Sequence, residues 1–163
     1  MTAPEMDAAG HGRYVAVVGP ADSATAGQLA AATEVGRLLA EAGAVVLTGG
    51  LHGVMRAAAT GARDAGGTAI GLLPGRDRAA GSPEHTFLLP TGLGELRNGL
   101  LVRAADAVVA VGGSWGTLSE IALARRTGVP LVLLDPWDLP DDVGTVVGSP
   151  AEALTALGRA LGA

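Results

Sequence analysis

Short apolar runs alternate along this chain with longer segments in which apolar residues recur every three or four positions. The runs predict strands at 14–19, 44–48, 68–73, 85–89, 106–111 and 130–134, and a weaker one near 143–147. The periodic segments predict helices at 25–41, 53–65, 95–105, 117–127 and 150–161. Apolar strands that alternate with amphipathic helices form parallel sheets covered on both faces. We therefore expect an α/β fold with a Rossmann-like, doubly wound parallel sheet.

Two of the predicted strands end in the same pattern, Gly-Gly-x-x-Gly, immediately before a helix. The glycines are Gly49, Gly50 and Gly53 in the first turn and Gly112, Gly113 and Gly116 in the second. Glycine lets the backbone approach an anion closely, and the free N–H groups at a helix N-terminus attract negative charge. Because the carboxyl ends of parallel strands share one edge of a sheet, we expect both turns, together with Gly19, to bind one phosphate-bearing ligand.

Composition limits the classes of protein that remain. The length of 163 residues is typical of one domain, which we place at 14–163 after a disordered tail at 1–13. Aromatic residues make up 2% of the chain, so the core must consist mostly of aliphatic side chains. The net charge is −5 and the arginines are scattered, which disfavours nucleic acid as a partner.

The sequence contains no clear pattern for a disulfide, a metal site, a signal peptide or a membrane span. Cysteine is absent and the three histidines are isolated, so we expect neither a disulfide nor a metal site. The first 13 residues lack the apolar stretch of a signal peptide, and no apolar run is long enough to span a membrane. We expect a cytoplasmic protein with no membrane partner.

Several polar and aromatic residues near the two glycine turns are candidates for chemistry. Glu120 follows Thr117 by one helical turn and can face the ligand edge, although a helix-dipole role explains it equally well. Arg97 begins a helix at the same edge and would meet a phosphate, pair with Glu120 or remain solvated. Trp115 would stack on a planar ring or pack on a partner subunit. His52, inside the first turn, would touch ligand or face solvent.

Two further segments have simpler interpretations. A polar loop at 74–84 is longer than the other connections. Its Arg76 and Arg78 would close over an anion or, as we favour, remain solvated. Asp22 and Ser23 are predicted as N-caps of the first helix.

Taken together, the motifs resemble the LOG family, whose members were once misnamed lysine decarboxylases. The resemblance covers about 14–135 and rests on the first glycine turn with Met55, on Arg97 nine residues before Asp106, and on the pattern Gly112-Gly113-x-x-Gly116-Thr117-x-x-Glu120. LOG enzymes hydrolyse the N-glycosidic bond of nucleoside 5′-monophosphates, using an arginine and the glutamate of such a motif. The resemblance implies catalytic roles for Arg97 and Glu120. It implies ligand contacts at Gly19, Gly49, Gly50, Gly53, Met55, Asn98, Gly112, Gly113, Ser114, Trp115, Gly116 and Thr117.

Two departures from the LOG pattern point to a smaller branch of the family. Asn98 stands where LOG enzymes have lysine, and Val111 stands where they have proline. Both variants resemble the branch related to the molybdenum cofactor carrier protein. Two main hypotheses therefore remain open, besides a nucleotide sensor whose oligomeric state responds to ligand. One is a nucleotide-binding protein that hydrolyses nucleoside monophosphates. The other is a non-catalytic protein that needs no cofactor and carries molybdenum cofactor as cargo. The family resemblance also implies a homodimer or a higher homo-oligomer.

Overall fold

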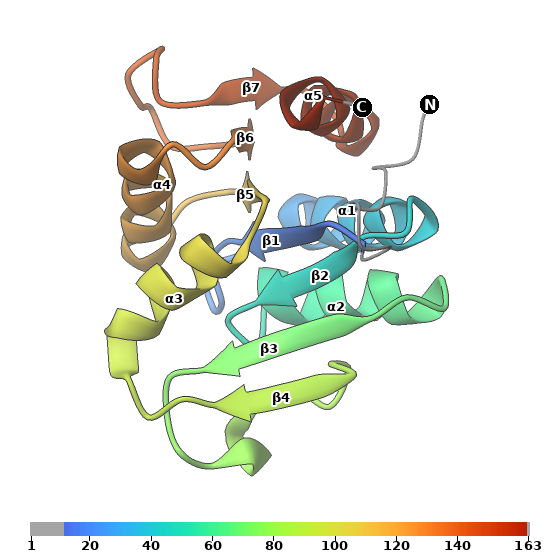
Figure 1. The fold of residues 1–163 in the computed structure, drawn as a ribbon, viewed down its shortest axis with the longest axis vertical. Helices are drawn as coiled ribbons and strands as arrows, with labels where there is room; N and C mark the ends of the chain where they lie inside the picture. Colours follow the sequence, from blue (N-terminus) through green and yellow to red (C-terminus); the bar gives the residue numbers. More distant parts are fainter. Residues whose placement is uncertain (1–11, 163) are drawn as a thin grey trace.

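The computed structural model of the protein describes residues 12–162, which form a seven-stranded parallel sheet with helices on both faces (Figure 1). Its strand order is β4-β3-β2-β1-β5-β6-β7, with every neighbouring pair parallel. The chain builds outward from β1 to β4 on one side, then returns to place β5, β6 and β7 on the other. The predicted Rossmann-like, doubly wound architecture is confirmed.

The elements lie close to their predicted ranges. The strands are β1 (Tyr14–Val18), β2 (Val45–Thr48), β3 (Ala69–Leu73), β4 (Phe87–Pro90), β5 (Ala107–Val111), β6 (Leu131–Leu134) and β7 (Thr145–Val147). The helices are α1 (Ala26–Glu41), α2 (Val54–Asp64), α3 (Arg97–Ala104), α4 (Trp115–Thr127) and α5 (Pro150–Leu161). Two short 3₁₀ turns, η1 (Arg78–Ala80) and η2 (Gly94–Leu96), were not predicted.

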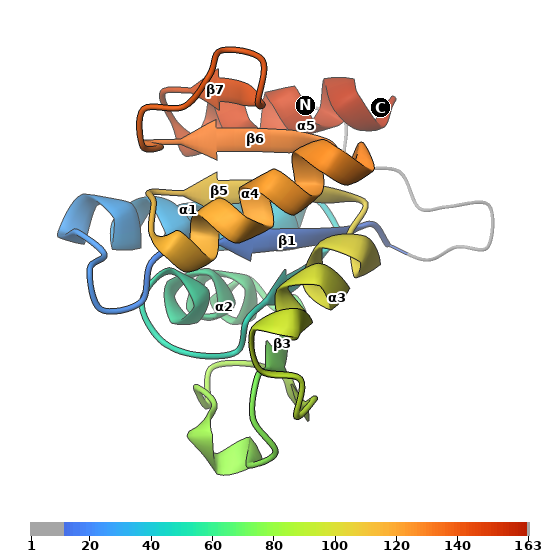
Figure 2. The same ribbon diagram turned by 90° about the vertical axis from the view of Figure 1, so that its left-hand side faces the viewer.

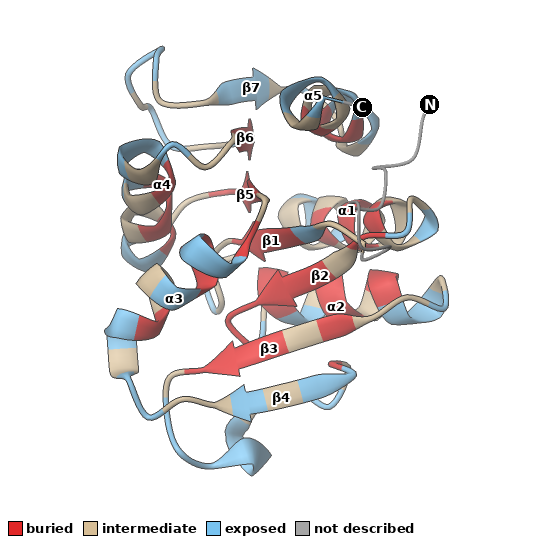
Figure 3. Cartoon of the chain, viewed as in Figure 1, coloured by how far each residue is buried: buried red, intermediate tan, exposed pale blue. Residues whose placement is uncertain are grey.

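Two layers of helices cover the sheet, with α1, α2 and α5 on one face and α3 and α4 on the other (Figures 1 and 2). The strand residues alternate between the faces, so Val15 and Val17 pack against the first layer while Ala16 and Val18 pack against the second. Strands β5 and β6 are buried along their whole length, whereas much of the edge strand β4 is exposed (Figure 3). As the composition predicted, the buried core consists mostly of valine, alanine and leucine.

The first helix begins differently from the prediction. Its N-cap is Thr25, whose hydroxyl accepts the Gln28 N–H at 3.2 Å while the Gln28 side chain accepts the Thr25 N–H at 3.1 Å. The prediction of Asp22 and Ser23 as N-caps was wrong because this reciprocal pair, a capping box, starts the helix at residue 26. Instead, Asp22 Oδ1 lies 3.1 Å from Nε2 of the exposed His52.

Helices α1 and α2 touch through their backbones. A side chain at Gly36 would overlap the carbonyl of Ala58, and one at Gly61 would overlap the carbonyl of Thr33. The absence of a side chain at both positions lets the two helices approach more closely than ordinary side-chain packing allows.

Strand β1 lies at the point where the strand order reverses, between β2 and β5. Ligands of such sheets bind outside the carboxyl ends of the strands near this point. At the opposite edge of the sheet, where the strands begin, Asp106 Oδ2 accepts the Tyr14 N–H at 2.8 Å. Asp106 Oδ1 lies 3.8 Å from Arg13 Nη1. The rest of the predicted tail, residues 1–11, lies outside the described residues. No helix in residues 12–162 is long and apolar enough to cross a membrane.

Candidate functional site

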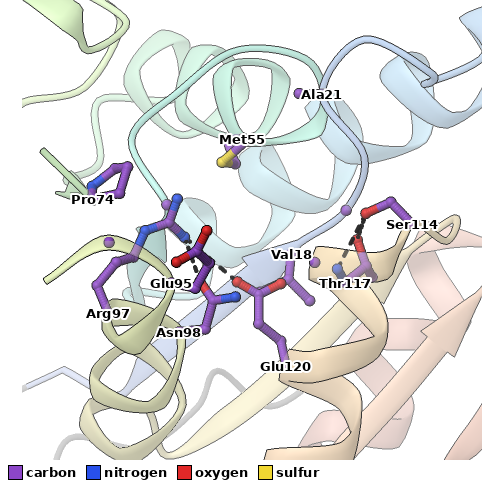
Figure 4. Close-up of a pocket in the computed structure, with 14 residues that line it drawn as sticks. Val18, Ala21, Met55, Pro74, Glu95, Arg97, Asn98, Ser114, Thr117 and Glu120 are labelled. Carbon is purple, nitrogen blue, oxygen red and sulfur yellow. Dashed lines mark hydrogen bonds and ion pairs between the residues drawn. The ribbon is translucent and has the colours of Figure 1, made fainter.

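A pocket of about 300 Å³ opens at the carboxyl edge of the sheet, between the loops that follow β1, β2, β3 and β5 (Figure 4). One wall is the N-terminal part of α4, and the facing wall is formed by η2 and the start of α3. Its volume is at the lower end of the range for small-molecule sites. The lining residues are Val18, Gly19, Ala21, Gly49, Met55, Pro74, Gly94, Glu95, Arg97, Asn98, Ser114, Gly116, Thr117 and Glu120.

Most of the residues chosen from the sequence lie in this pocket. Those that line it are Gly19, Gly49, Met55, Arg97, Asn98, Ser114, Gly116, Thr117 and Glu120. Those that do not line it are Gly50, Gly53, Gly112, Gly113 and Trp115. Arg76 and Arg78, on the long loop, also lie outside it, although Pro74 of the same loop lines it.

The glycines outside the pocket are explained by the shape of the turns. Gly50, Gly53 and Gly112 have φ values of 79°, 66° and 74°, which only glycine adopts without strain. A side chain at Gly112 would meet that of Gln28, and one at Gly113 would meet the Trp137 indole ring. The motif spacing thus marks tight strand-to-helix connections as well as an anion site.

Gly49 has a different role because it lies against the side chains of the pocket. A methyl group at this position would overlap the Arg97 guanidinium and would lie 2.7 Å from the Met55 sulfur. The bare backbone at Gly49 therefore makes room for the arginine. Helix α3 supplies the charge and the loop after β2 supplies the space that the charge occupies.

The N-terminus of α4 supplies hydrogen-bond donors to the pocket. Ser114 is its N-cap, and the Ser114 hydroxyl accepts the Thr117 N–H at 3.2 Å. This cap explains why α4 begins two residues earlier than predicted. The N–H groups of Trp115 and Gly116 have no acceptor within the helix, because the first turn of any helix leaves its donors free. With the helix dipole behind them, they form an arrangement that attracts an anion.

Arg97 and Glu120 face each other across the pocket from α3 and α4 (Figure 4). Arg97 Nη1 lies 3.7 Å from Glu120 Oε1, and both side chains are more than nine-tenths buried. Burial raises the pKa of Glu120 to about 7, although the nearby arginine acts in the opposite direction. Burial also lowers the pKa of Arg97. Within residues 12–162, Arg97 Nε is buried without a hydrogen-bond partner.

Asn98 connects the two walls. Its side-chain oxygen accepts a hydrogen bond from Arg97 Nη1 at 3.0 Å, and its side-chain nitrogen donates to Ser119 Oγ at 3.0 Å. Ser119 Oγ in turn donates to the Gly116 carbonyl at 2.6 Å. Because both ends of its amide bind protein atoms, Asn98 holds Arg97 in place and fixes α3 against α4. The residue that departs from the LOG pattern is therefore part of the frame of the pocket.

The two tryptophans lie together beside the second glycine turn. Trp115 and Trp137 meet edge to face, with ring centroids 5.3 Å apart and an interplanar angle of 82°. Trp115 is 79% exposed. Its side chain contacts Trp137 in the segment that follows β6, a contact that no sequence pattern predicted.

His85 is buried, which the sequence did not predict. Its Nε2 lies 2.6 Å from Thr48 Oγ1 and its Nδ1 lies 3.0 Å from the Ser82 carbonyl. Since Nδ1 must donate to that carbonyl, a neutral ring accepts the Thr48 hydroxyl hydrogen at Nε2. Thr48 also accepts the Gly50 N–H at 2.9 Å. His85 thereby ties the loop at 82–85 to the first glycine turn.

Sequence reasoning missed five residues that line the pocket: Val18, Ala21, Pro74, Gly94 and Glu95. Val18 and Ala21 flank the predicted Gly19, so their position next to it was the available signal. Pro74, Gly94 and Glu95 come from a place where two loops meet. The Gly94 N–H donates to the Pro74 carbonyl at 2.9 Å. Nothing local in the sequence marks that contact.

Comparison with known proteins places the chain in a family. The molybdenum cofactor binding protein of the phototrophic bacterium Rippkaea orientalis is 35% identical, with a TM-score of 0.87 over 94% of this chain and 99% of that one. The molybdenum cofactor carrier protein of Chlamydomonas reinhardtii is also 35% identical, with a TM-score of 0.84 over 93% and 99% of the two chains.

A relative of different description is a cytokinin riboside 5′-monophosphate phosphoribohydrolase of Mycobacterium tuberculosis. It is 32% identical over 132 residues, which cover 76% of this chain and 71% of that protein. The expected resemblance to the LOG family and to its carrier-related branch is thus confirmed. The model of the SLOG cluster4 family matches residues 12–157, most of the chain, and the protein therefore belongs to the SLOG cluster4 family.

Proposed function

We propose that this protein binds a small phosphate monoester that carries a planar ring, and that the pocket beside α4 is its binding site. The observation that carries the proposal is the buried Arg97, whose Nε has no hydrogen-bond partner among residues 12–162. Buried polar atoms almost always have partners, so an unpaired donor in a pocket favours a missing acceptor. The free N–H groups at the start of α4 provide further donors on the facing wall.

The similarity to the molybdenum cofactor proteins of R. orientalis and C. reinhardtii favours a carrier over an enzyme. It extends over nearly the whole length of each chain, and those proteins are described by what they bind or carry. Molybdenum cofactor is a phosphorylated pterin, which has the chemical character that we propose for the ligand. We therefore infer that molybdenum cofactor is a candidate cargo, held by the residues that would also hold a nucleotide.

Hydrolysis of nucleoside 5′-monophosphates is the second candidate, and the position of Glu120 favours it. When a base leaves ribose, positive charge builds up on the sugar, and a carboxylate nearby stabilises that transition state more than the ground state. Glu120 lies one helical turn beyond the α4 N-terminus, where the 5′-phosphate would bind. Water would then add to the sugar carbon, releasing the free base and ribose 5-phosphate. Arg97, beside Glu120 on the facing wall, would bind and align the sugar.

The first experiment is incubation of the purified protein with a panel of nucleoside 5′-monophosphates. Chromatography would measure the free base and ribose 5-phosphate, and thermal unfolding would measure binding of ribose 5-phosphate and of molybdenum cofactor. A carrier is expected to show stabilisation without release of base. Release that disappears in Glu120→Gln would establish the phosphoribohydrolase instead. The absence of both release and stabilisation would refute the proposed site.

We also propose that the protein forms a homo-oligomer, as its family resemblance implies. Three leucines in the segment from just before η2 into α3 are exposed: Leu93 and Leu100 each at 45%, and Leu96 at 78%. Exposed apolar side chains that cluster in this way are typical of contact surfaces. Light scattering after gel filtration would measure the mass, and Leu96→Asp is expected to yield the monomer. A wild-type protein that is monomeric at all concentrations would refute this part of the proposal.

A further inference from the structure

A second carboxylate lines the same pocket as Glu120. Glu95 lies in η2, directly after Gly94, whose φ of 58° turns the chain toward the pocket. Hydrogen bonds fix this turn, because Thr91 Oγ1 donates to the Leu73 carbonyl at 2.7 Å and accepts the Leu93 N–H at 3.2 Å. Glu95 is thus presented by an anchored segment rather than by a free loop.

Glu95 is exposed to solvent where it lines the pocket, and its charge is not used by the fold. Among residues 12–162, the Glu95 carboxylate forms no hydrogen bond and has no arginine or histidine nitrogen within 4.0 Å. Arg97, the one cationic side chain of the described residues that lines the pocket, lies instead beside Glu120. An uncompensated carboxylate repels a phosphate. Glu95 is therefore free to accept hydrogen bonds from a part of the ligand other than its phosphate.

The arrangement of the pocket indicates which part of the ligand that is. Figure 4 shows Ser114 and Thr117 on one side, Pro74 and Arg97 on the other, and Glu95 between them. A phosphate held at the α4 N-terminus places its sugar or linker near Glu120, one turn along the helix. The ring at the far end of the ligand then extends toward Pro74 and Glu95, where proline provides an apolar surface.

We propose that Glu95 selects ligands whose ring presents two adjacent donors, an N–H and an NH₂, as the 2-amino-4-oxo edge of pterins and guanine does. The two oxygens of a carboxylate accept two parallel N–H groups, as they do from arginine. Adenine and hypoxanthine lack this pair of donors. This proposal rests on the proposed function, because it assumes a phosphate monoester in the same pocket. It adds the chemical class of the ring and the residue that recognises it.

Calorimetric titration with two matched pairs of probes tests the proposal. GMP is compared with IMP, which lacks the 2-amino group. The phosphate of 6-hydroxymethylpterin is compared with the corresponding lumazine phosphate, in which oxygen replaces that group. In the wild type, the aminated member of at least one pair is expected to bind about 10-fold more tightly or better, since a bidentate contact discriminates by roughly that factor. The pair that shows the difference identifies the ring as guanine or pterin.

The variant Glu95→Gln is expected to reduce that preference to less than about 3-fold while binding ribose 5-phosphate at least as tightly as the wild type. Glu41→Gln, an exposed carboxylate at the far end of α1, is the matched control and should keep the preference. Equal binding within both pairs in the wild type, or an unchanged preference in Glu95→Gln, would overturn the role of Glu95 while the proposed function stands. Failure of all probes, ribose 5-phosphate included, would overturn both.

Discussion

The ionised form of Glu120 should lower the stability of the protein, and this follows from its burial beside Arg97. The pKa of this carboxyl rises from 4.5 to about 7 on folding. Between these two pH values the folded state keeps a proton that the unfolded state has released, so the free energy of unfolding falls as the pH rises. Since each tenfold change in proton affinity is worth about 1.4 kcal/mol, the loss is about 3 kcal/mol above pH 7.

Urea unfolding of the wild type and Glu120→Gln at pH values from 4.5 to 8.5 measures this effect. Glutamine resembles the protonated carboxyl at every pH, so the two proteins should be similar near pH 4.5 and the variant more stable by about 3 kcal/mol at pH 8. Contributions from other groups, His85 among them, are common to both proteins and cancel in the difference. A difference that stays constant across this range would refute the assignment of a raised pKa to Glu120.

Three other positions allow shorter tests. Gly49→Ala should displace Arg97, which would cost about 1–3 kcal/mol of stability and weaken binding of ribose 5-phosphate in unfolding and titration measurements. Gly99→Ala, at a position in α3 with open space around it, should retain the stability and the affinity in the same measurements. Burial lowers the pKa of His85 below 6.5, so the contribution of this residue to stability is present above that pH and is lost on acidification. The unfolding free energies of His85→Gln and the wild type should therefore approach each other as the pH falls from 7.5 to 5. A difference between them that does not depend on pH would contradict this. Ser149→Ala removes the N-cap of α5 and should destabilise the protein by about 1 kcal/mol in thermal unfolding, with no change in ligand affinity.

The fold could be predicted from the sequence because each strand and helix carries its own local signal. Apolar runs, glycine ends and caps such as Ser149 and Gly128 lie next to the elements that they define. Arg97 and Glu120 could be chosen for a related reason, since both lie within a turn or so of a helix N-terminus at a known edge of the sheet. That the two side chains are buried beside each other could not be predicted, because it depends on how α3 packs against α4.

The residues that escaped prediction depend on contacts between distant segments. Glu95 lines the pocket because its turn is bonded to the end of β3 and the residue after it, 18 to 20 positions earlier in the chain. The four glycines that were predicted to bind ligand but lie outside the pocket show the converse. The turns themselves require glycine there, through positive φ values or a close neighbour, so a ligand site and a tight turn need the same residue type.

The backbone contact between α1 and α2 has a consequence for how this scaffold can diversify. Any side chain at Gly36 or Gly61 would push the two helices apart. The start of α2 is also bonded to the loop that lines the pocket, since the Val54 N–H donates to the Pro20 carbonyl at 3.0 Å. That half of the binding site resists alteration. On the other side of the sheet, Gly99 has open space around it. An engineer who seeks a new ligand preference should therefore vary the α3 side around Arg97 and Asn98, keep those two residues, and leave the α1–α2 pair untouched.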